Sequence, residues 1–529
     1  MTHYDAVIVG AGHHGLVAAI ELAEQGWQVV VLEERDVVGG AVAHRQVGDF
    51  VMDEFSACHP LALASPVLKG LELERYGLQW ARTDRVVAHL ADPSDTHGDL
   101  LSADPAVTAE HLDAGHTGDG HQWRRLVEAY DSVKGPLLDA LLLQWPPIRS
   151  LPALVRAVGG SQLLDFARFA LLPVEQLSRE RFGGSAARNL LSGNAMHADI
   201  PPDAPGSGIY GWIMTMLAQD VGFPSPRGGT GGLAQALAAR AQASGVQIRT
   251  GDRVTRIETS GDRVQGVQTA SGEALRARVV IADTSAPMLY GELLDDVPAG
   301  IRARMDRFTW DLPTVKLNLG LSAPMPWTAA AARGTGVVHV GGDHRELVTW
   351  SAELSAGRIP HHPFALIGQM TTIDPSRSPA GTEALWLYTH LPRGLEDEDA
   401  AAELIGRSEQ MLDRFAPGWR DLVVERWDQT PRSLAQADAN LGRGAVGGGT
   451  MQLFQQAMWR PVTGLGGPRT YVRGLYLGSA AIHPGGGVHG GAGHMAAHAA
   501  LRDRGVVGRG AGLVGRRLRR IIDNTTPRF

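Results

Sequence analysis

The residues with the most chemical content stand near the start of the chain, between two short apolar runs. The motif is Gly10-Ala11-Gly12-His13-His14-Gly15, and Glu33 follows it by eighteen residues. Glycines at this spacing permit a tight turn, a close approach of the backbone to a pyrophosphate, and tight packing of a helix on a strand. A carboxylate placed like Glu33 accepts hydrogen bonds from ribose hydroxyls and repels a 2′-phosphate. The motif predicts a dinucleotide site that disfavours NADP, with a plain glycine-rich turn as the alternative.

A strand–loop–helix–strand unit has to position these groups, and the flanking sequence predicts one. Tyr4–Val9 and Val29–Leu32 are apolar runs typical of buried strands, and Leu16–Gln25 between them has helical character. A glycine pair soon after the acid lets backbone amides pass near a cofactor, although such a pair also suits a simple turn. The further cofactor contacts predicted here are Glu34, Arg35, Gly39, Gly40 and Ala41.

The nucleotide-binding unit resumes after a long insertion. Residues 226–233 lead into an alanine-rich helix, short strands follow between residues 245 and 282, and a last strand covers residues 474–479. The predicted fold is therefore α/β, with a Rossmann-like domain that is discontinuous in sequence. Its boundaries are placed at residues 1–88, 222–295 and 466–505, with an inserted α+β substrate domain over 89–221 and 296–465 and a basic tail over 506–529.

The inserted domain combines helices with a sheet. Apolar residues recur at intervals of three and four over residues 123–217, which predicts helices. The apolar piece 137–147 predicts a buried helix, with a tunnel lining or a contact with lipid as the alternatives. Residues 300–390 alternate with period two, which predicts a half-exposed sheet, and a helix is expected over about 397–415. The polar stretch 92–120 predicts a solvated loop with a short helix. Its histidines match no metal-binding spacing, so no metal site is expected.

Composition narrows the class of protein. The 529 residues carry a net charge of −7, which gives no electrostatic reason to expect a nucleic acid partner. The lone Cys58 excludes a disulfide framework, a thiolate metal cluster and the paired redox cysteines of disulfide reductases, and it suits a reducing cytoplasm. No apolar run reaches the length of about 18 residues that spans a bilayer. The chain opens directly on a strand, so we expect no signal peptide and a cytoplasmic location.

Four separated stretches resemble the FAD-dependent amine oxidase and phytoene desaturase superfamily, in the phytoene-dehydrogenase-like branch that includes the pyridine nucleotide-disulfide oxidoreductase domain 2 proteins. The stretches are residues 10–19, 226–233, 245–257 and 474–494. They occur in the order of the family and cover nearly the whole chain. The resemblance implies FAD as the bound dinucleotide. It implies non-covalent binding, because Cys58 lies early whereas the cysteinyl flavin linkages of the family come late.

The resemblance also assigns residues to the cofactor. Val254 would contact the adenine side through its backbone, and the loop 484–488 with Gly486, Gly487 and Val488 would face the flavin. A helix expected to begin near Gly487 would direct free amides and its positive end at the flavin, which favours hydride acceptance. Gly478 and Ser479 are assigned to the cofactor as well, although many relatives carry an acid where this chain has Ser479.

Candidate catalytic residues are few. Lys316 lies on an alternating segment, opposite Leu317 and Leu319, and the superfamily's amine oxidases place a lysine near flavin N5 on a comparable strand. The alternative is a lysine on the solvated face of a strand. His483 and His489 bracket the loop assigned to the flavin, and either a base or a structural histidine is compatible with these positions. Tyr388 and His390 are weaker candidates.

The function predicted is a flavin-dependent dehydrogenase or desaturase that oxidises a C–C bond of a hydrophobic small molecule. Only one dinucleotide motif is visible, so the electrons are expected to pass to O2 or to a quinone. The alternatives are a flavin amine oxidase acting on C–N, a redox-neutral flavin isomerase, and a non-enzymatic FAD-binding scaffold. The segment 513–522 is basic and amphipathic, so it can hold the protein at anionic lipid, with a solvated terminal helix as the alternative. The oligomeric state is left open.

Overall fold

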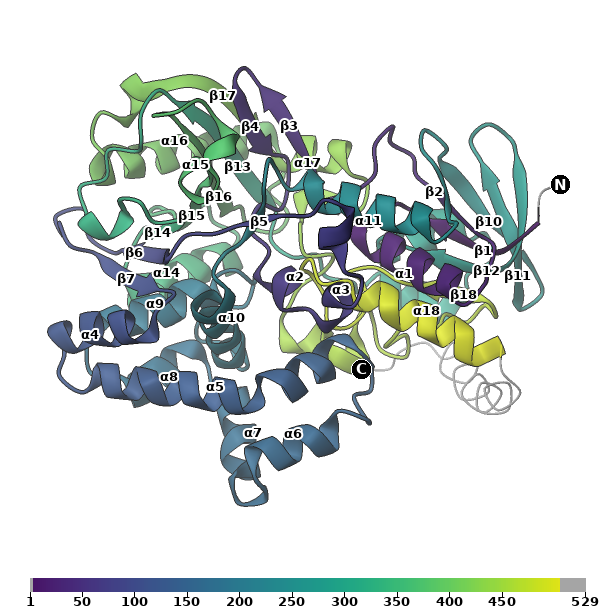
Figure 1. The fold of residues 1–529 in the computed structure, drawn as a ribbon, viewed down its shortest axis with the longest axis horizontal. Helices are drawn as coiled ribbons and strands as arrows, with labels where there is room; N and C mark the ends of the chain where they lie inside the picture. The colour runs from purple at the N-terminus through teal and green to yellow at the C-terminus, as the bar shows by residue number, and fades with distance from the viewer. Residues whose placement is uncertain (1–2, 505–529) are drawn as a thin grey trace.

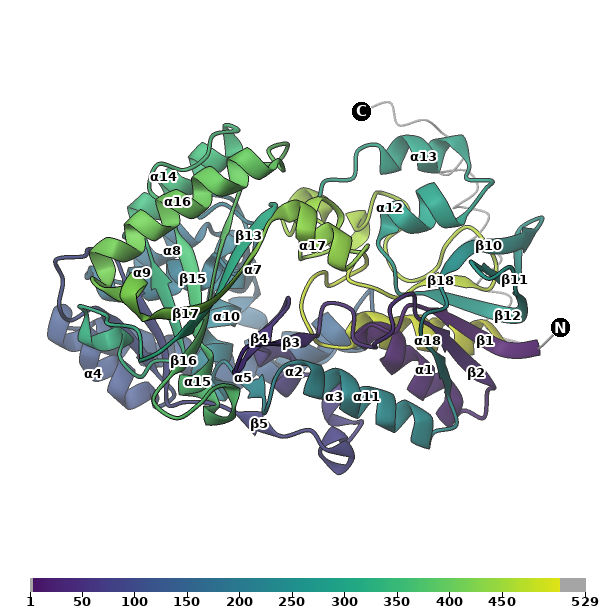
Figure 2. The same ribbon diagram turned by 90° about the horizontal axis from the view of Figure 1, so that it is seen from above.

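Two seven-stranded sheets stand side by side, each flanked by helices (Figures 1 and 2). The computed structural model describes residues 3–504, so the predicted basic tail and its amphipathic segment lie outside the described residues. Within this range no helix combines the length and the apolar character needed to cross a membrane.

The first sheet has the strand order β10-β11-β12-β1-β2-β9, with β18 also paired to β12. Its strands are β1 (His3–Val9), β2 (Val29–Leu32), β9 (Gln247–Arg249), β10 (Val254–Ser260), β11 (Arg263–Thr269), β12 (Ala274–Ala282) and β18 (Leu475–Leu477). The strands β9, β2, β1, β12 and β18 run parallel, and β10 and β11 add an antiparallel flap. All residues of β2 are buried, as expected for a parallel strand covered on both faces.

Helices from distant parts of the chain cover this sheet. They are α1 (His13–Glu24), α11 (Gly231–Ala243) and α18 (Gly491–Arg504) on one face, and α12 (Ala286–Met288), η3 (Leu289–Leu293) and α13 (Ala299–Met305) on the other. Side chains of β1 alternate between the two cores, Ala6 and Ile8 toward α1 and Val7 and Val9 toward α12. The predicted Rossmann-like domain, assembled from separated segments, is confirmed.

The second sheet has the order β17-β13-β16-β15-β14-β6-β7. Its strands are β6 (Arg85–Leu90), β7 (Asp99–Ser102), β13 (Thr314–Leu321), β14 (Val337–Val340), β15 (Ala365–Gln369), β16 (Glu383–His390) and β17 (Val423–Gln429). The helix α16 (Glu398–Phe415) packs on one face, as predicted over 397–415. The opposite face carries α14 (His344–Ser355), α15 (Met370–Ile373) and the helices described next.

A helical layer covers this opposite face and extends beyond it (Figure 1). It consists of α4 (Pro105–Gly115), α5 (Asp119–Leu142), α6 (Leu151–Val158), α7 (Leu163–Leu171), α8 (Val174–Arg181), α9 (Ser185–Ala195) and α10 (Ser207–Val221), which confirms the helices predicted over residues 123–217. Short elements join the layers: β3 (His44–Val47), β4 (Phe50–Asp53), α2 (Pro60–Ala64), α3 (Pro66–Lys69), β5 (Trp80–Ala81), β8 (Ser225–Pro226) and α17 (Pro431–Ala437).

Three local predictions were wrong. The sheet predicted as half-exposed is buried, since every residue of β13 is inaccessible between the α16 core on one side and a cavity wall on the other. The stretch 92–120 is not mainly a solvated loop, because it holds β7 as well as the expected short helix, α4. The domain boundary placed at residue 88 falls inside β6, so the second sheet begins at Arg85.

Candidate functional site

The glycine motif forms the turn between β1 and α1. Gly10 has a φ of +96°, which favours glycine, and its amide donates to the carbonyl of Leu32 at 2.8 Å. Gly12 caps α1 without any side-chain hydrogen bond. Apart from the amide of Gly15, which donates to Asp283, the first-turn amides are therefore left open toward the cavity that Gly10, Gly12 and His13 line, which is the arrangement that binds anionic groups.

Asp283 lies directly beneath this turn, at the carboxyl end of β12. Its Oδ2 accepts a hydrogen bond from the amide of Gly15 at 2.8 Å, and a Cβ placed on Gly12 would lie 2.5 Å from the same oxygen. Burial raises the pKa of Asp283 to about 8, and the carboxylates of Asp438 and Glu33 add to this shift against the opposing effect of the Gly15 amide. The close fit explains why glycine is needed at position 12.

Glu33 ends β2 beside the same turn. One carboxylate oxygen accepts from the amide of Ala11 at 2.7 Å, and the other accepts from the amide of Arg35 at 2.9 Å. Burial raises the pKa of Glu33, and these two amides oppose the shift. The carboxylate lines the cavity, at the place where the sequence predicted a ribose-binding acid.

A cavity of about 680 Å³ runs from this turn into the space between the two sheets. Its lining contains most residues predicted for the cofactor, namely Gly10, Gly12, His13, His14, Glu33, Glu34, Arg35, Gly40, Ala41, Val254, Ser479, Gly486, Gly487 and Val488. It does not contain Gly15, Gly39 or Gly478, which lie behind the wall. Gly15 packs on the Gly10 carbonyl, and Gly478 packs between Ile281 and Ala496.

The loop 484–490 forms the cavity wall before α18. The helix begins at Gly491 rather than near Gly487, because His489 occupies the turn: its Nδ1 accepts from the Gly491 amide at 3.0 Å, and its Nε2 lies 3.3 Å from the Gly485 carbonyl. Burial lowers the pKa of His489 to about 4. Both ring nitrogens thus have backbone partners, so the geometry favours a structural histidine over a base at this position.

His483 stands on the other side of the loop. Its ring centroid lies 4.2 Å from that of Trp145, and its Nε2 is buried without a partner. Burial lowers its pKa to about 3, with His489 contributing in the same direction. A neutral imidazole with a free nitrogen at the cavity wall is able to accept a hydrogen bond from a bound group.

Lys316 is buried on β13, contrary to the alternative of a solvated face. Its Nζ donates to the carbonyls of Asp53 and Phe55, and the side chain lines the cavity. Burial lowers the pKa of Lys316 to about 8. Because an ammonium has three donors, the two backbone carbonyls leave one N–H for a group in the cavity. Tyr388 and His390 line the same cavity from β16.

These features fit FAD. The remaining open first-turn amides suit the pyrophosphate and Glu33 suits the ribose, while the buried nitrogens of His13, His14 and His483 that have no protein partner line the same cavity and can bind a polar ring system. A model of the flavin containing amine oxidoreductases matches residues 15–494. The chain belongs to this family.

Two curated relatives show how far this likeness extends. Mouse "pyridine nucleotide-disulfide oxidoreductase domain-containing protein 2" is 29% identical over 94% of each chain. A zeta-carotene-forming phytoene desaturase of Myxococcus xanthus is 26% identical over 91% of this chain and 90% of its own length. Among solved structures, wild-type putrescine oxidase bound to putrescine covers 94% of this chain and 98% of its own, with a TM-score of 0.59 at 16% identity, which supports the family fold.

A buried ion pair holds the backbone segment whose carbonyls bind Lys316. This pair was not predicted from the sequence. Asp53, at the end of β4, binds Arg377 Nη2 through both carboxylate oxygens at 2.8 and 3.0 Å, and both side chains are fully buried. Asp53 also accepts from the amide of Thr230 at 3.1 Å, just before α11. The pair fixes the backbone of residues 53–55, whose carbonyls hold Lys316, against the start of α11.

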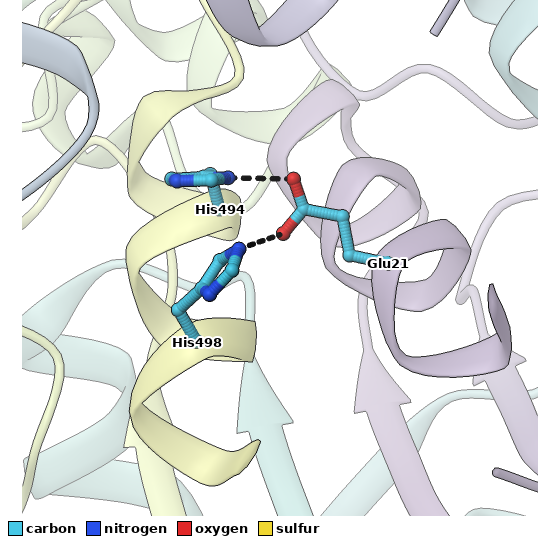
Figure 3. A group of neighbouring side chains, drawn as sticks. All are labelled: Glu21, His494 and His498. Atoms are coloured by element: carbon cyan, nitrogen blue, oxygen red, sulfur yellow. Dashed lines mark hydrogen bonds and ion pairs between the residues drawn. The ribbon is translucent and has the colours of Figure 1, made fainter. Parts of the chain in front are cut away.

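Glu21, His494 and His498 gather outside the cavity, where α1 packs on α18 (Figure 3). His494 Nδ1 lies 2.6 Å and His498 Nε2 lies 3.7 Å from the two oxygens of Glu21. Among residues 3–504 this is the group whose spacing suits a metal ion. Burial is the main cause that lowers the pKa of His498; His494, Arg502 and Arg149 lower it further, and the carboxylate of Glu21 opposes them. We interpret the trio as a carboxylate–histidine link between two helices of the FAD domain.

Asp283 gives a pH-dependent prediction. Because its folded-state pKa of about 8 lies above the value of an unfolded aspartate, about 3.9, the native protein retains a proton that the unfolded chain releases. Its contribution to stability is therefore full at acidic pH and is lost as the pH rises toward 8. Asp283→Asn keeps an acceptor for the Gly15 amide but cannot ionise. The Tm of this variant should exceed that of the wild type by more at pH 8 than at pH 5; parallel Tm profiles would contradict the assignment.

Proposed function

We propose that this flavin oxidoreductase dehydrogenates a C–C bond of a hydrophobic small molecule and passes the electrons to O2 or a quinone. The observation that carries the proposal is the apolar character of the cavity beyond the glycine turn. This part of the wall is formed by the end of α5, by α10 and by β16, with Leu137, Leu141, Ile209, Ile213, Met214 and Trp386. Such a wall favours a substrate recognised by burial of apolar surface.

The polar groups at this end of the cavity do not suit recognition of an amine. Asp199 accepts hydrogen bonds from Arg393, Thr450 and the Met451 amide. Asp311 accepts from the amides of Gly447 and Gly449 at 2.6 and 3.0 Å. Both carboxylates thus already accept hydrogen bonds from the protein, which reduces their capacity to bind a substrate ammonium. This favours C–C over C–N oxidation.

The residues of the chain have defined tasks in such a reaction. When bound, FAD supplies the acceptor for two electrons and one hydrogen of the substrate. The apolar wall excludes water and orients the substrate chain, while Lys316 directs its remaining N–H into the cavity. With a pKa near 8, Lys316 is mostly protonated at neutral pH and places a positive charge beside the site. Such a charge stabilises negative charge that develops there during hydrogen transfer.

Anaerobic flavin reduction tests the proposal. Purified holoprotein is mixed with a panel of terpenoid and carotenoid hydrocarbons, polyketide-like molecules and primary and secondary amines, and bleaching of the visible flavin band is recorded. We expect bleaching by a hydrophobic compound and a product lighter by two hydrogens. Bleaching by amines alone would establish C–N oxidation, and isomerised product without an acceptor would establish an isomerase. A flavin that no compound reduces or turns over would support the scaffold alternative.

A further inference from the structure

A row of side chains, all polar except for one leucine, crosses the second sheet on its cavity side. Strand register pairs Lys316 on β13 with Tyr388 on β16, then Leu366 on β15, His339 on β14, His89 on β6 and Asp99 on β7. Directly paired residues share one face of a sheet. The row therefore leads from the Lys316 site to the edge strand β7. Its last three members, His339, His89 and Asp99, carry titratable side chains.

His197 connects this row to the cavity. It follows α9, lines the cavity, and stacks on Phe223 with ring centroids 5.1 Å apart. Its Nε2 lies 3.2 Å from Nε2 of His339, so one of these two nitrogens donates to the other. This leaves Nδ1 as the nitrogen of His197 available to a molecule in the cavity.

The next two histidines meet beside Gly193. His339 Nδ1 and His89 Nδ1 are both buried without a partner. A Cβ built on Gly193 of α9 would lie 2.5 Å from the first and 2.7 Å from the second, so both nitrogens crowd the same side of Gly193 and leave no room for a side chain there. Buried polar atoms nearly always have a partner, and a buried water commonly supplies it. One water placed here would bond both rings.

The hydrogen bonds set the direction of the row. His89 Nε2 lies 2.8 Å from the carbonyl of Gly342, so Nε2 carries the proton and Nδ1 is an acceptor. A water that donates to His89 Nδ1 can accept from Nδ1–H of His339, whose Nε2 then accepts from Nε2–H of His197. Each hydrogen bond along this row then joins one donor to one acceptor, and Nδ1 of His197 ends the row as a lone pair.

We propose that His197 accepts the proton released in substrate dehydrogenation, and that His339, a water above Gly193 and His89 conduct it toward Asp99. The inference rests on the proposed function. When bound, FAD would accept the hydrogen and the electron pair of one substrate C–H bond. The adjacent C–H bond leaves its electrons in the new C=C bond and its proton on Nδ1 of His197. Transfer along the row leaves the charge on His89, where burial lowers the imidazole pKa and the neighbouring carboxylate of Asp99 acts against that shift.

The first test requires no substrate. A high-resolution crystal structure of the wild-type protein should show a water within hydrogen-bond distance of both Nδ1 atoms, and ¹⁵N spectra of labelled imidazoles should show His89 as the Nε2–H tautomer. Gly193→Ala should expel the water, while Gly406→Ala, in α16 with open space around its Cα, should retain it. Absence of a water between the two Nδ1 atoms, or a strongly scattering cation in its place, would overturn the relay whether or not the proposed function holds.

The second test follows proton release with a pH indicator during anaerobic bleaching by the panel compound that reduces the flavin. His339→Gln keeps a hydrogen-bonding side chain but cannot relay a proton, and we expect proton release at least about tenfold slower than in the wild type. His111→Gln, in the same domain but off the row, should behave like the wild type. Wild-type proton release in a folded, FAD-loaded His339→Gln protein would overturn the proposal.

Discussion

Gly15→Ala should weaken FAD binding by at least about tenfold. A methyl group on Gly15 would overlap the carbonyl oxygen of Gly10 and lie 3.0 Å from Oδ2 of Asp283, so the turn between β1 and α1 would have to move. Overpacking of this kind costs about 1–3 kcal/mol, and about 1.4 kcal/mol corresponds to a factor of ten in affinity. Because the obstructing atom is backbone, no side-chain rotation can relieve the overlap.

The measurement is FAD titration of the apoprotein, followed by quenching of flavin fluorescence, together with the flavin content of the protein as purified. Gly406→Ala is the matched control: it adds the same methyl to another helix, where no atom lies within 4 Å of the new Cβ. This control should bind FAD like the wild type. Equal affinities of the two variants would contradict the role assigned to the packing beneath the turn.

Sequence alone predicted the parts of the site that local spacing encodes. The turn glycines and Glu33 lie within one strand–helix–strand unit, so their positions relative to one another follow from the length of α1 and the register of two adjacent strands. Asp283 was missed although it directly follows a predicted strand. The carboxyl ends of neighbouring parallel strands meet at one edge, and applying that rule to β12 would have found it.

Lys316 shows where periodicity misleads. Alternation along β13 correctly separates Leu317 and Leu319 from Lys316, but it does not say what covers the second face. The β3–β4 hairpin, some 260 residues earlier in the chain, supplies the carbonyls of Asp53 and Phe55 that make burial of the ammonium tolerable. The row of His339 and His89 was equally invisible, since it depends on strand pairing across the whole sheet.

Arg377→Met should destabilise the fold by about 3–5 kcal/mol, because it leaves the carboxylate of Asp53 buried without its cation. Arg377 also donates to the Ser225 hydroxyl at 2.9 Å and to the Val51 carbonyl at 3.2 Å, so the substitution frees several buried acceptors at once. The backbone of residues 53–55 loses its anchor, and Lys316 loses its carbonyl partners with it. The free energy of unfolding should be measured by urea titration of the apoprotein, alongside FAD content.

Arg276→Met provides the control for this variant. Arg276 pairs with Glu258 at 2.9 Å across the flap of the first sheet, but its side chain is 36% exposed and that of Glu258 is 27% exposed. A half-exposed pair contributes about 0–1 kcal/mol, so the control should unfold close to the wild type. Each variant removes one positive charge. A difference between their free energies of unfolding therefore reports the effect of burial. Equal stabilities would mean that the Asp53 carboxylate is satisfied without Arg377, and that another group holds the Lys316 carbonyls in place.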